Sequence, residues 1–402
     1  MSRAVVSRRE WLLIAGSAVS LRAADAREEQ FQSLVHAYES QGFHRTGTAV
    51  DKNSADWLAG EVRRAGLEPQ LEAFGLSRID PVTATLTSGE RRIEGIPLFD
   101  GGFTGPAGVA GSLGGEEIGL EETAVNAADT GALGRARRNG KFRAIVCITR
   151  GARPGLCPSN ADQFRQPFGP PVLQVSSEEM AWLRGLAQQK AEVRVVVDVK
   201  RVQAEAFNVT GRIAGSDAAL PPLVVMTPRS GWYTCASERG GGILCWLELM
   251  KILQRAKPAR DVVFVASSGH ELGHLGINAF VDRRAGIVKN SVGWIHLGAN
   301  IGAAQDPGNT LQASDDEMEK KWAAAMTGAG LAILRRVPRG TVPGGEAEVV
   351  HRGGGRYASA IGRNAMFHNP EDRGPQVVDS KAVGRFVIAL TALANELANR
   401  PL

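Results

Sequence analysis

The stretch that decides the fold is Asp261-Val-Val-Phe-Val-Ala-Ser-Ser-Gly-His-Glu-Leu-Gly-His-Leu-Gly276. Its first part, residues 261–266, is an apolar run rich in β-branched side chains, which is typical of a buried strand. Residues 267–269, Ser-Ser-Gly, then interrupt the run as turn residues do. The pattern therefore predicts that His270 and Glu271 lie just beyond the end of a buried strand, where a helix can begin.

The same stretch also matches a second pattern, because His270-Glu-Leu-Gly-His274 has the HExxH spacing of zinc proteases. That motif places two zinc-binding imidazoles one helical turn apart, with Glu271 as the base between them. It requires the middle of an amphipathic helix, and Gly273 would weaken such a helix by about 1 kcal/mol relative to alanine. The sequence also offers no third ligand at a matching spacing. We therefore favour the strand end, with the HExxH helix as the alternative.

This stretch resembles the zinc aminopeptidase superfamily, which includes glutamate carboxypeptidase and glutaminyl cyclase. The resemblance lies in the order of a strand, a short polar turn, two polar site residues and then Leu-Gly-x-x-Gly. In that register His270 stands at the general base and Glu271 at a metal ligand. The segments Arg45-Thr-Gly-Thr48 and Arg64-Ala-Gly-Leu67 resemble the opening of the same domain. The resemblance implies an α/β fold with a mostly parallel central sheet and helices on both faces, and a peptide or small amide as substrate.

The resemblance also implies which metal ligands are present. The loop from Cys235 to Gly242 resembles the family's Gly-Ala-Asp-Asp-Asn-x-x-Gly, which puts Glu238 at a bridging ligand. The segment around His368 resembles the terminal aromatic-His-Thr segment, which makes His368 the last ligand. Glu238, Glu271 and His368 would then hold one zinc, with an open position for water.

The ligands of a second zinc are missing. Thr227 stands where the family has a ligand His, Arg229 stands where it has the partner carboxylate, and Gly298 stands where it has an Asp. The expected function is therefore a single-zinc aminopeptidase or related amide hydrolase, with His270 either as base or as fourth ligand. A glutaminyl-cyclase-like acyltransferase is a further alternative, because those enzymes keep one zinc.

A metal-free peptidase relative that acts as a binding module is the other main alternative. Arg229 and Arg239 can neutralise Glu238 and Glu271 through charge-assisted hydrogen bonds and so replace the missing cation. His274 and His296 are expected to be packing or rim residues rather than ligands. His351, in a loop rich in Arg and Gly, could contact substrate.

After the first 26 residues, the pattern of apolar and turn residues divides the chain into three segments. Residues 27–75 are expected to be largely helical, with a helix from about Ser54 to Ala65 capped by Asn53 or Ser54. Residues 76–203 form short β-rich pieces with Gly-rich connections, which resembles a protease-associated domain inserted into the catalytic one. Residues 204–402 alternate strands and helices, which favours a mostly parallel sheet with its site at the carboxyl ends of the strands.

The first 26 residues are expected to be a targeting segment. Ser7-Arg-Arg-Glu-Trp-Leu12 precedes a short apolar stretch, and Ala24-Asp-Ala26 offers a small-residue cleavage site. The paired arginines resemble a twin-arginine signal, which implies a periplasmic or secreted protein. No later run of about 18 apolar residues predicts a membrane helix. The formal charge of +5, without clustered Lys and Arg, argues against nucleic acid as a partner.

The four cysteines, Cys147, Cys157, Cys235 and Cys245, have no zinc-knuckle spacing. Export would allow disulfides, and Cys147 with Cys157 is the expected pair by sequence distance. Cys235 lies near the expected site and could be a nucleophile, but a small buried residue is the preferred interpretation because no base can be assigned to it.

Overall fold

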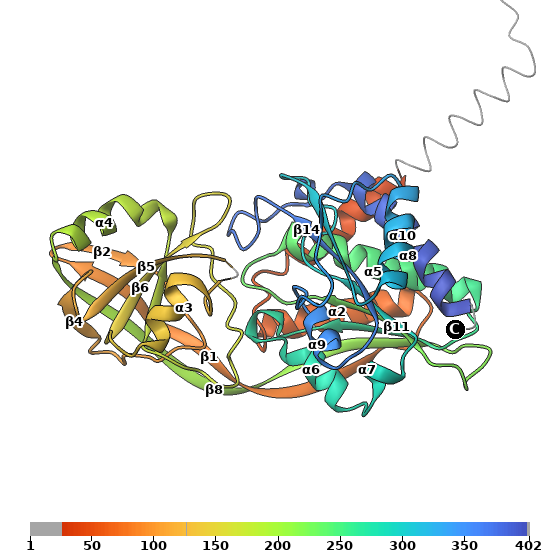
Figure 1. The fold of residues 1–402 in the computed structure, drawn as a ribbon, viewed down its shortest axis with the longest axis horizontal. Coiled ribbons are helices and arrows are strands. Elements are labelled where there is room, and N and C mark those ends of the chain that lie inside the picture. Colours follow the sequence, from red (N-terminus) through yellow and green to blue (C-terminus); the bar gives the residue numbers. More distant parts are fainter. Residues whose placement is uncertain (1–25, 126, 400–402) are drawn as a thin grey trace, which may run out of the picture.

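The computed structural model describes residues 26–125 and 127–399. Two parts lie side by side, and a ribbon of two long strands joins them (Figure 1). The targeting signal expected at residues 1–26 lies outside the described residues, except for its last position. No helix within the described residues is long and apolar enough to cross a membrane.

The larger part contains the parallel centre of a mixed sheet. Strands β14, β11, β9 and β10 lie next to one another in that order and all run parallel. Strand β12 and strand β8 flank this centre and run antiparallel to it. The bounds of the sheet's strands are β9 (Leu223–Pro228), β10 (Val262–Ser267), β11 (Gly293–Leu297), β12 (Gly308–Ala313), β13 (Arg335–Arg336), β14 (Tyr357–Arg363), β1 (Gln70–Ser88), β8 (Glu192–Ile213), β2 (Arg91–Glu94) and β4 (Val109–Ser112).

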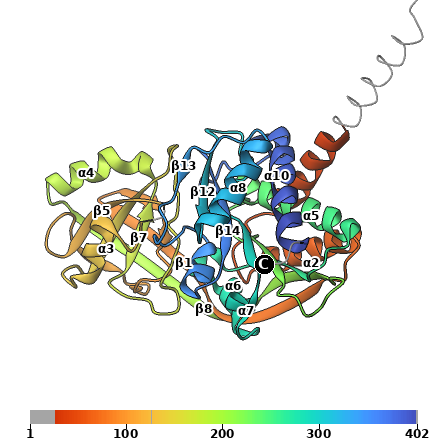
Figure 2. The same ribbon diagram turned by 45° about the vertical axis from the view of Figure 1, so that its right-hand side comes forward.

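Helices cover both faces of this sheet because alternate side chains of its buried strands point to opposite faces. Leu223 and Val225 of β9 pack with the helix 26–39, α2, α5, α8 and α10 on one face. Val224 and Met226 pack with α6, α7 and α9 on the other. Figure 2 shows α8 and α10 together over the first face. The bounds are α2 (Ala49–Arg64), α5 (Ala236–Ala256), α6 (Leu275–Asp282), α7 (Ile287–Asn290), α8 (Asp316–Gly328), α9 (Ala347–Arg352) and α10 (Ser380–Asn399), with short 3-10 turns at η2 (His270–Leu272) and η3 (Pro375–Val377).

The smaller part has its own sheet and its own apolar core. The strands of this sheet lie in the order β3, β7, β6, β5. Buried side chains of this sheet pack against α4 and against the far ends of β1 and β8. Its elements are β3 (Ile96–Pro97), β5 (Ile118–Ala124), β6 (Ala144–Arg150), β7 (Val172–Val175), α3 (Gly131–Arg138), η1 (Ser177–Glu179) and α4 (Met180–Gln188).

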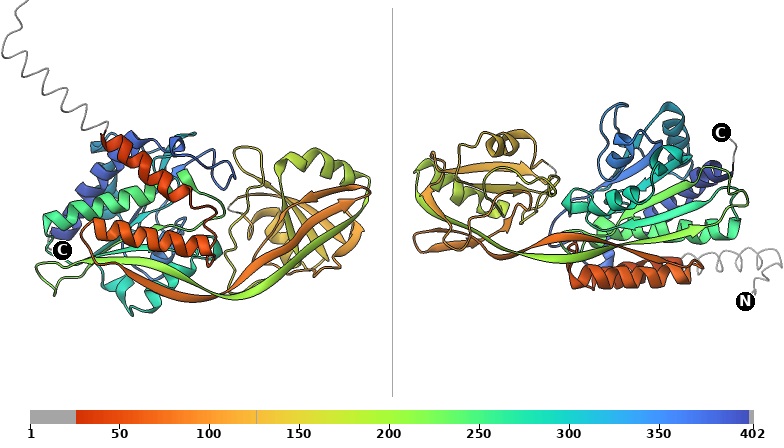
Figure 3. Two further views of the ribbon diagram at one scale, coloured as in Figure 1. Left: turned by 180° about the vertical axis from the view of Figure 1, so that it is seen from behind. Right: turned by 90° about the horizontal axis from the view of Figure 1, so that it is seen from below.

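Strands β1 and β8 pair antiparallel over almost their whole length and connect the two parts (Figure 3). Each strand runs across one of the boundaries expected at 75/76 and 203/204. The expectation that residues up to 75 are helical was wrong at its end, because β1 begins at Gln70. The insert's resemblance to a protease-associated domain remains a prediction.

Two local predictions need correction. Thr48, not Asn53 or Ser54, caps α2, since its side chain accepts a hydrogen bond from the backbone N–H of Asp51. Cys147 and Cys157 form no disulfide and are free thiols. Cys147 packs among the apolar side chains around Leu133, whereas Asn369 donates a hydrogen bond to the Cys157 sulfur, so the two thiols have separate surroundings.

Candidate functional site

The residues singled out in the sequence gather where the parallel strands end. Thr227 and Arg229 lie at the carboxyl end of β9, His270 and Glu271 follow β10, and Gly298 follows β11. The carboxyl ends of parallel strands are where α/β sheets place their ligand sites. Because β8 runs antiparallel to β10, its early residues lead from this edge into the smaller part, which therefore lies beyond the same edge.

The segment after β10 is a tight turn and not a zinc-protease helix. His270–Leu272 make a single 3-10 turn. Gly269, Gly273 and His274 all have positive φ, the left-handed conformation that no α-helix contains. This observation excludes the HExxH interpretation and confirms the strand end.

The Glu271 carboxylate is held by hydroxyl groups. Oε1 accepts hydrogen bonds from the Thr46 hydroxyl at 2.6 Å and the Thr46 backbone N–H at 3.0 Å. Oε2 accepts one from the Ser230 hydroxyl at 2.6 Å. Three of the about four lone-pair positions of a carboxylate are thus occupied by protein donors. Glu271 joins the start of α2 to the loop after β9.

Glu238 forms a buried ion pair with its neighbour in sequence. Arg239 Nη2 lies 2.7 Å from Glu238 Oε1, and each side chain is only 1% exposed. Burial alone would raise the pKa of Glu238, but the charges of Arg239 and His368 lower it to about 2. Arg239 Nε donates to the Ser230 carbonyl, whereas its two Nη atoms have no hydrogen-bond partner of good geometry among the described residues.

His368 faces the same carboxylate from the other side. Its Nδ1 lies 2.6 Å from the carbonyl oxygen of Pro158. A carbonyl only accepts, so Nδ1 carries the proton. Nε2 lies 3.5 Å from Glu238 Oε1 and has no hydrogen-bond partner among the described residues. Pro158 therefore orients this imidazole toward Glu238, as carbonyls orient metal-binding histidines.

Arg229 and Thr227 lie beside this centre but do not contact its carboxylates. The Arg229 guanidinium donates to the backbone carbonyls of Asp51 and Phe207 and lies 2.8 Å from the Asp51 carboxylate. Thr227 donates its hydroxyl to the carbonyl of Leu297. Arg229 therefore does not neutralise Glu238 or Glu271.

His270 lies beside a carboxylate that the sequence did not reveal. Its Nδ1 is 3.7 Å from Glu346 Oε1, and the Ser267 hydroxyl donates to that oxygen. Both side chains are buried, and neither His270 Nδ1 nor Glu346 Oε2 has a hydrogen-bond partner among the described residues. Burial and then the charge of Arg239 keep the pKa of His270 well below its usual range, so the imidazole is neutral.

The other three histidines singled out in the sequence, His274, His296 and His351, occupy separate positions. The His274 ring lies 5.0 Å from that of His270, between centroids, and lines a pocket. His296 is buried and its Nδ1 lies 2.8 Å from the Ser359 hydroxyl, as a packing residue would. His351 lies on α9 and not in a loop, and its ring packs edge-on against Tyr357.

Comparison with known proteins gives one curated relative and many solved structures. The relative, aminopeptidase YwaD of Bacillus subtilis (strain 168), is 24% identical over 277 residues, which cover 64% of this chain and 59% of the relative. BSAP, a zinc aminopeptidase from Bacillus subtilis, is 18% identical with a TM-score of 0.73 and covers 93% of this chain and 95% of that chain. A peptidase M28 precursor from Shewanella amazonensis SB2B is 15% identical, also with a TM-score of 0.73, over 96% and 98%.

The chain has the zinc aminopeptidase fold. Identities this low show the fold alone, and the match spans about three fifths of the curated relative's length. No family model matches the sequence.

The positions that correspond to zinc ligands in the zinc aminopeptidases show whether this chain can still hold metal. A Cβ atom at Gly298 would lie 2.7 Å from an Ile361 side-chain carbon and 3.0 Å from the His296 ring, so these residues fill the space of the missing Asp side chain. At the other position Arg239 lies against Glu238, and Glu271 is held by Thr46 and Ser230. No three His, Cys, Asp or Glu side chains in residues 26–125 and 127–399 are arranged to hold an ion. The predicted donor set does not fit zinc in this arrangement.

Cys235 has the properties of a structural residue. It is 1% exposed and precedes α5 in the left-handed conformation. Burial and then the charge of Glu238 raise the pKa of its thiol well above the usual range, so a thiolate nucleophile is disfavoured.

The sequence did not reveal the residues that hold the side chains of this site, because they lie far from them along the chain. Thr46 and Ser230 bind Glu271, Pro158 binds His368, and Glu346 lies beside His270. Asp372 accepts hydrogen bonds from the backbone N–H groups of Ser237 and Glu238 at the start of α5. Only the Arg45-Thr-Gly-Thr48 motif gave a signal for any of these contacts.

Proposed function

We propose that this chain binds peptides at the zinc aminopeptidase site without a catalytic zinc, and that the guanidinium of Arg239 takes the place of the metal. The observation that supports this most directly is the buried contact of 2.7 Å between Arg239 Nη2 and Glu238 Oε1. A guanidinium is always charged and gives Glu238 the positive partner that zinc would otherwise supply. A zinc ion next to it would be repelled at short range. Peptides are the expected ligands because the relatives of this fold are aminopeptidases by name.

One observation favours the rival function, a single-zinc peptidase on Glu238, Glu271 and His368. Two ligands of a tetrahedral zinc lie about 3.4 Å apart, given metal–ligand bonds of about 2.0–2.2 Å. His368 Nε2 and Glu238 Oε1 are 3.5 Å apart, and the contact of His368 Nδ1 with the Pro158 carbonyl turns Nε2 toward Glu238. This rival needs Glu271 and Arg239 to change rotamer. Zinc bound there would polarise a carbonyl or activate water, with His270 as the neighbouring base.

Metal analysis of the full chain separates the two functions. We expect no stoichiometric zinc after purification without an affinity tag, and peptide binding by calorimetry that EDTA leaves unchanged. One zinc per chain, lost in His368→Ala but kept in His351→Ala, would establish the zinc peptidase instead. His351 is the matched control because it packs against Tyr357 on α9.

A second variant tests the replacement itself. Arg239→Asn installs the amide that the zinc aminopeptidase register has at this position and removes the competing charge. We expect this variant to gain zinc-dependent thermal stabilisation that the native chain lacks, because a ligand that binds only the folded state raises its stability. Without that gain, Arg239 would not be the feature that excludes the metal.

Export to the periplasm through the twin-arginine signal also remains a proposal. It predicts that replacing Arg8 and Arg9 by Lys blocks export of the folded precursor. Unchanged export of that variant would contradict it.

A further inference from the structure

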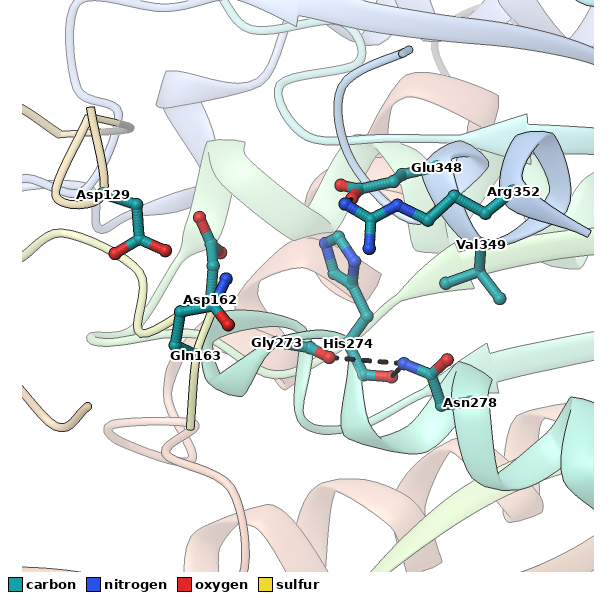
Figure 4. A pocket seen from close by; sticks show the side chains of 9 residues that line it. All are labelled: Asp129, Asp162, Gln163, Gly273, His274, Asn278, Glu348, Val349 and Arg352. Carbon is teal, nitrogen blue, oxygen red and sulfur yellow. Dashed lines mark hydrogen bonds and ion pairs between the residues drawn. The ribbon is translucent and has the colours of Figure 1, made fainter. Parts of the chain in front are cut away.

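A pocket of about 320 Å³ lies where the smaller part meets the edge of the central sheet (Figure 4). Asp129 and Asp162 come to it from the smaller part, His274 forms part of its wall, and Glu348 and Arg352 of α9 lie opposite. This volume is at the small end of ligand pockets, which run from about 300 to 1,000 Å³. It can take one side chain or a small amine, but not a long peptide.

Carboxylates outnumber basic groups around this pocket. Glu348 and Arg352 form an i,i+4 ion pair, so their charges cancel. Arg137 lies 2.7 Å from both Asp100 and Asp129 and neutralises one of these two carboxylates. One negative charge of that group is therefore left over.

Asp162 adds a second uncompensated charge. No basic side chain among the described residues pairs with its carboxylate, which keeps an exposed surface in the hollow. Desolvation by the pocket walls, although the side chain still reaches solvent, and then the charges of Asp129, Asp100 and Glu348 raise the pKa of Asp162 to about 6. Like charges gathered in a recess raise a carboxyl pKa when no cation offsets them, and a bound cation would remove this cost.

The pocket also adjoins the buried site. Burial lowers the pKa of His274 to about 3, so its ring adds no positive charge to the wall. The centroids of the His270 and His274 rings are 5.0 Å apart, and His270 is 5% exposed with no hydrogen-bond partner for Nδ1 among the described residues. The backbone of the wall is shared as well, because the Ala161 N–H donates to the Glu271 carbonyl. The pocket is therefore separated from the buried His270 by the His274 side chain, which lines it.

We propose that this pocket binds the cationic group of a peptide, an ammonium or a guanidinium, and that it selects ligands carrying such a group next to the site. The proposal rests on the proposed function for the rest of the peptide, but the pocket itself can be tested separately. Asp162 would accept charge-assisted hydrogen bonds from the cation, and the one negative charge that Arg137 leaves uncompensated on Asp100 and Asp129 would add to the negative field. The cation could come from the N-terminus or from a basic side chain.

The test is calorimetric binding of short peptides to the full chain. Matched peptides carry lysine, arginine or the uncharged isostere norleucine, each with a free or an acetylated N-terminus. We expect about tenfold weaker binding once the relevant cation is removed, as for the loss of one charge-assisted hydrogen bond. If acetylation weakens binding, the pocket takes the N-terminus, whereas a preference for lysine over norleucine assigns it to a side chain.

Variants connect the effect to the pocket. Asp162→Asn should abolish the preference for the cation, and Asp162→Glu should keep part of it. Asp282→Asn, an exposed carboxylate on α6 that does not line the pocket, should leave it unchanged. Equal binding of charged and uncharged peptides, or a preference that survives Asp162→Asn, would overturn the proposal.

A small probe distinguishes failure of the pocket from failure of the proposed function. Lysinamide titrated by NMR should bind in a manner that depends on Asp162. If lysinamide binds and no peptide does, the pocket stands and the peptide-binding function is wrong. If neither lysinamide nor any peptide binds, both proposals are wrong.

Discussion

Arg239→Met in zinc-free buffer tests the central ion pair most directly. The change removes the guanidinium but keeps an unbranched apolar chain, and it leaves Glu238 charged and buried without its partner. Removing one member of a buried ion pair costs about 3–5 kcal/mol. The pKa of Glu238 gives an independent figure: each pKa unit corresponds to about 1.4 kcal/mol, so a fall from 4.5 to about 2 contributes about 3 kcal/mol at neutral pH.

The pH dependence of this cost has a definite sign. In the native chain the pKa of Glu238 lies below its unfolded value, so its contribution is complete above pH 4.5 and is lost as pH falls toward 2. In Arg239→Met the carboxyl can escape its unpaired charge by taking a proton, so the penalty should shrink as pH is lowered. Glu238→Gln leaves an arginine that cannot lose its proton, so its penalty should stay constant above pH 4.5 and shrink only below it, where the native chain loses the contribution of Glu238.

Urea denaturation followed by circular dichroism measures these costs, with unchanged m values as the sign that the two end states are comparable. The double variant Glu238→Gln/Arg239→Met should cost about 3 kcal/mol less than the sum of the single variants. Lys52→Met serves as control, because its exposed i,i+4 pair with Asp56 is worth about 0.3–0.5 kcal/mol. A cost below about 1 kcal/mol for Arg239→Met, the range of surface pairs, would refute the reasoning.

Three further predictions concern stability. Burial lowers the pKa of His44, His274 and His296 to about 3, whereas an unfolded chain has a histidine pKa of about 6.5. The folded state therefore binds fewer protons than the unfolded state, and the free energy of unfolding should fall as pH drops from 7 toward 5. Urea titrations at several pH values should show this fall, weakened in His44→Gln but not in the exposed His36→Gln, and a flat profile would contradict it. Gly241→Ala should prevent folding in soluble-expression assays because its Cβ would lie 1.7 Å from the Ile301 carbonyl oxygen, whereas Gly60→Ala in α2 meets nothing within 4 Å and should stabilise by up to about 1 kcal/mol. Thr48→Ala should cost about 0.5–2 kcal/mol as a lost helix cap, while Ser54→Ala should cost nothing in the same thermal melts because its buried hydroxyl has no partner among the described residues.

Three of the four parallel strands at the centre of the fold, β9, β10 and β11, could be predicted from the sequence because they are buried, whereas β14 was not predicted. Residues 223–226, 261–266 and 292–297 are largely apolar runs, and each matches a strand within two residues. Strand β8 could not be predicted at its full length. Its middle, residues 198–205, contains no buried residue and no apolar run, so the sequence pattern breaks where the backbone pairing continues.

The residue types of the candidate site could be predicted from the sequence, but the contacts between their side chains could not. The spacing after β10 placed His270 and Glu271 correctly at a strand end. Whether Arg229 or Arg239 would pair with Glu238 depended on side-chain direction, and Arg229 instead found Asp51 in α2. Glu346 lies beside His270 but 76 positions later in the chain. It follows two glycines, so no apolar repeat around it predicts where its side chain points.

The ribbon of β1 and β8 gives the two parts a particular mechanical relation. Their backbone hydrogen bonds form a long ladder with one irregularity, so the ribbon resists stretching and shearing along its length. Its weakest point is the irregularity between Pro81 and Thr83, where register shifts and the exposed Val82 is the extra residue. Bending there would swing Asp129 and Asp162 relative to α9 as a unit. The width of the acidic pocket therefore depends on the curvature of these two strands. A peptide that contacts both sides of the pocket would hold the two parts of the chain in one orientation.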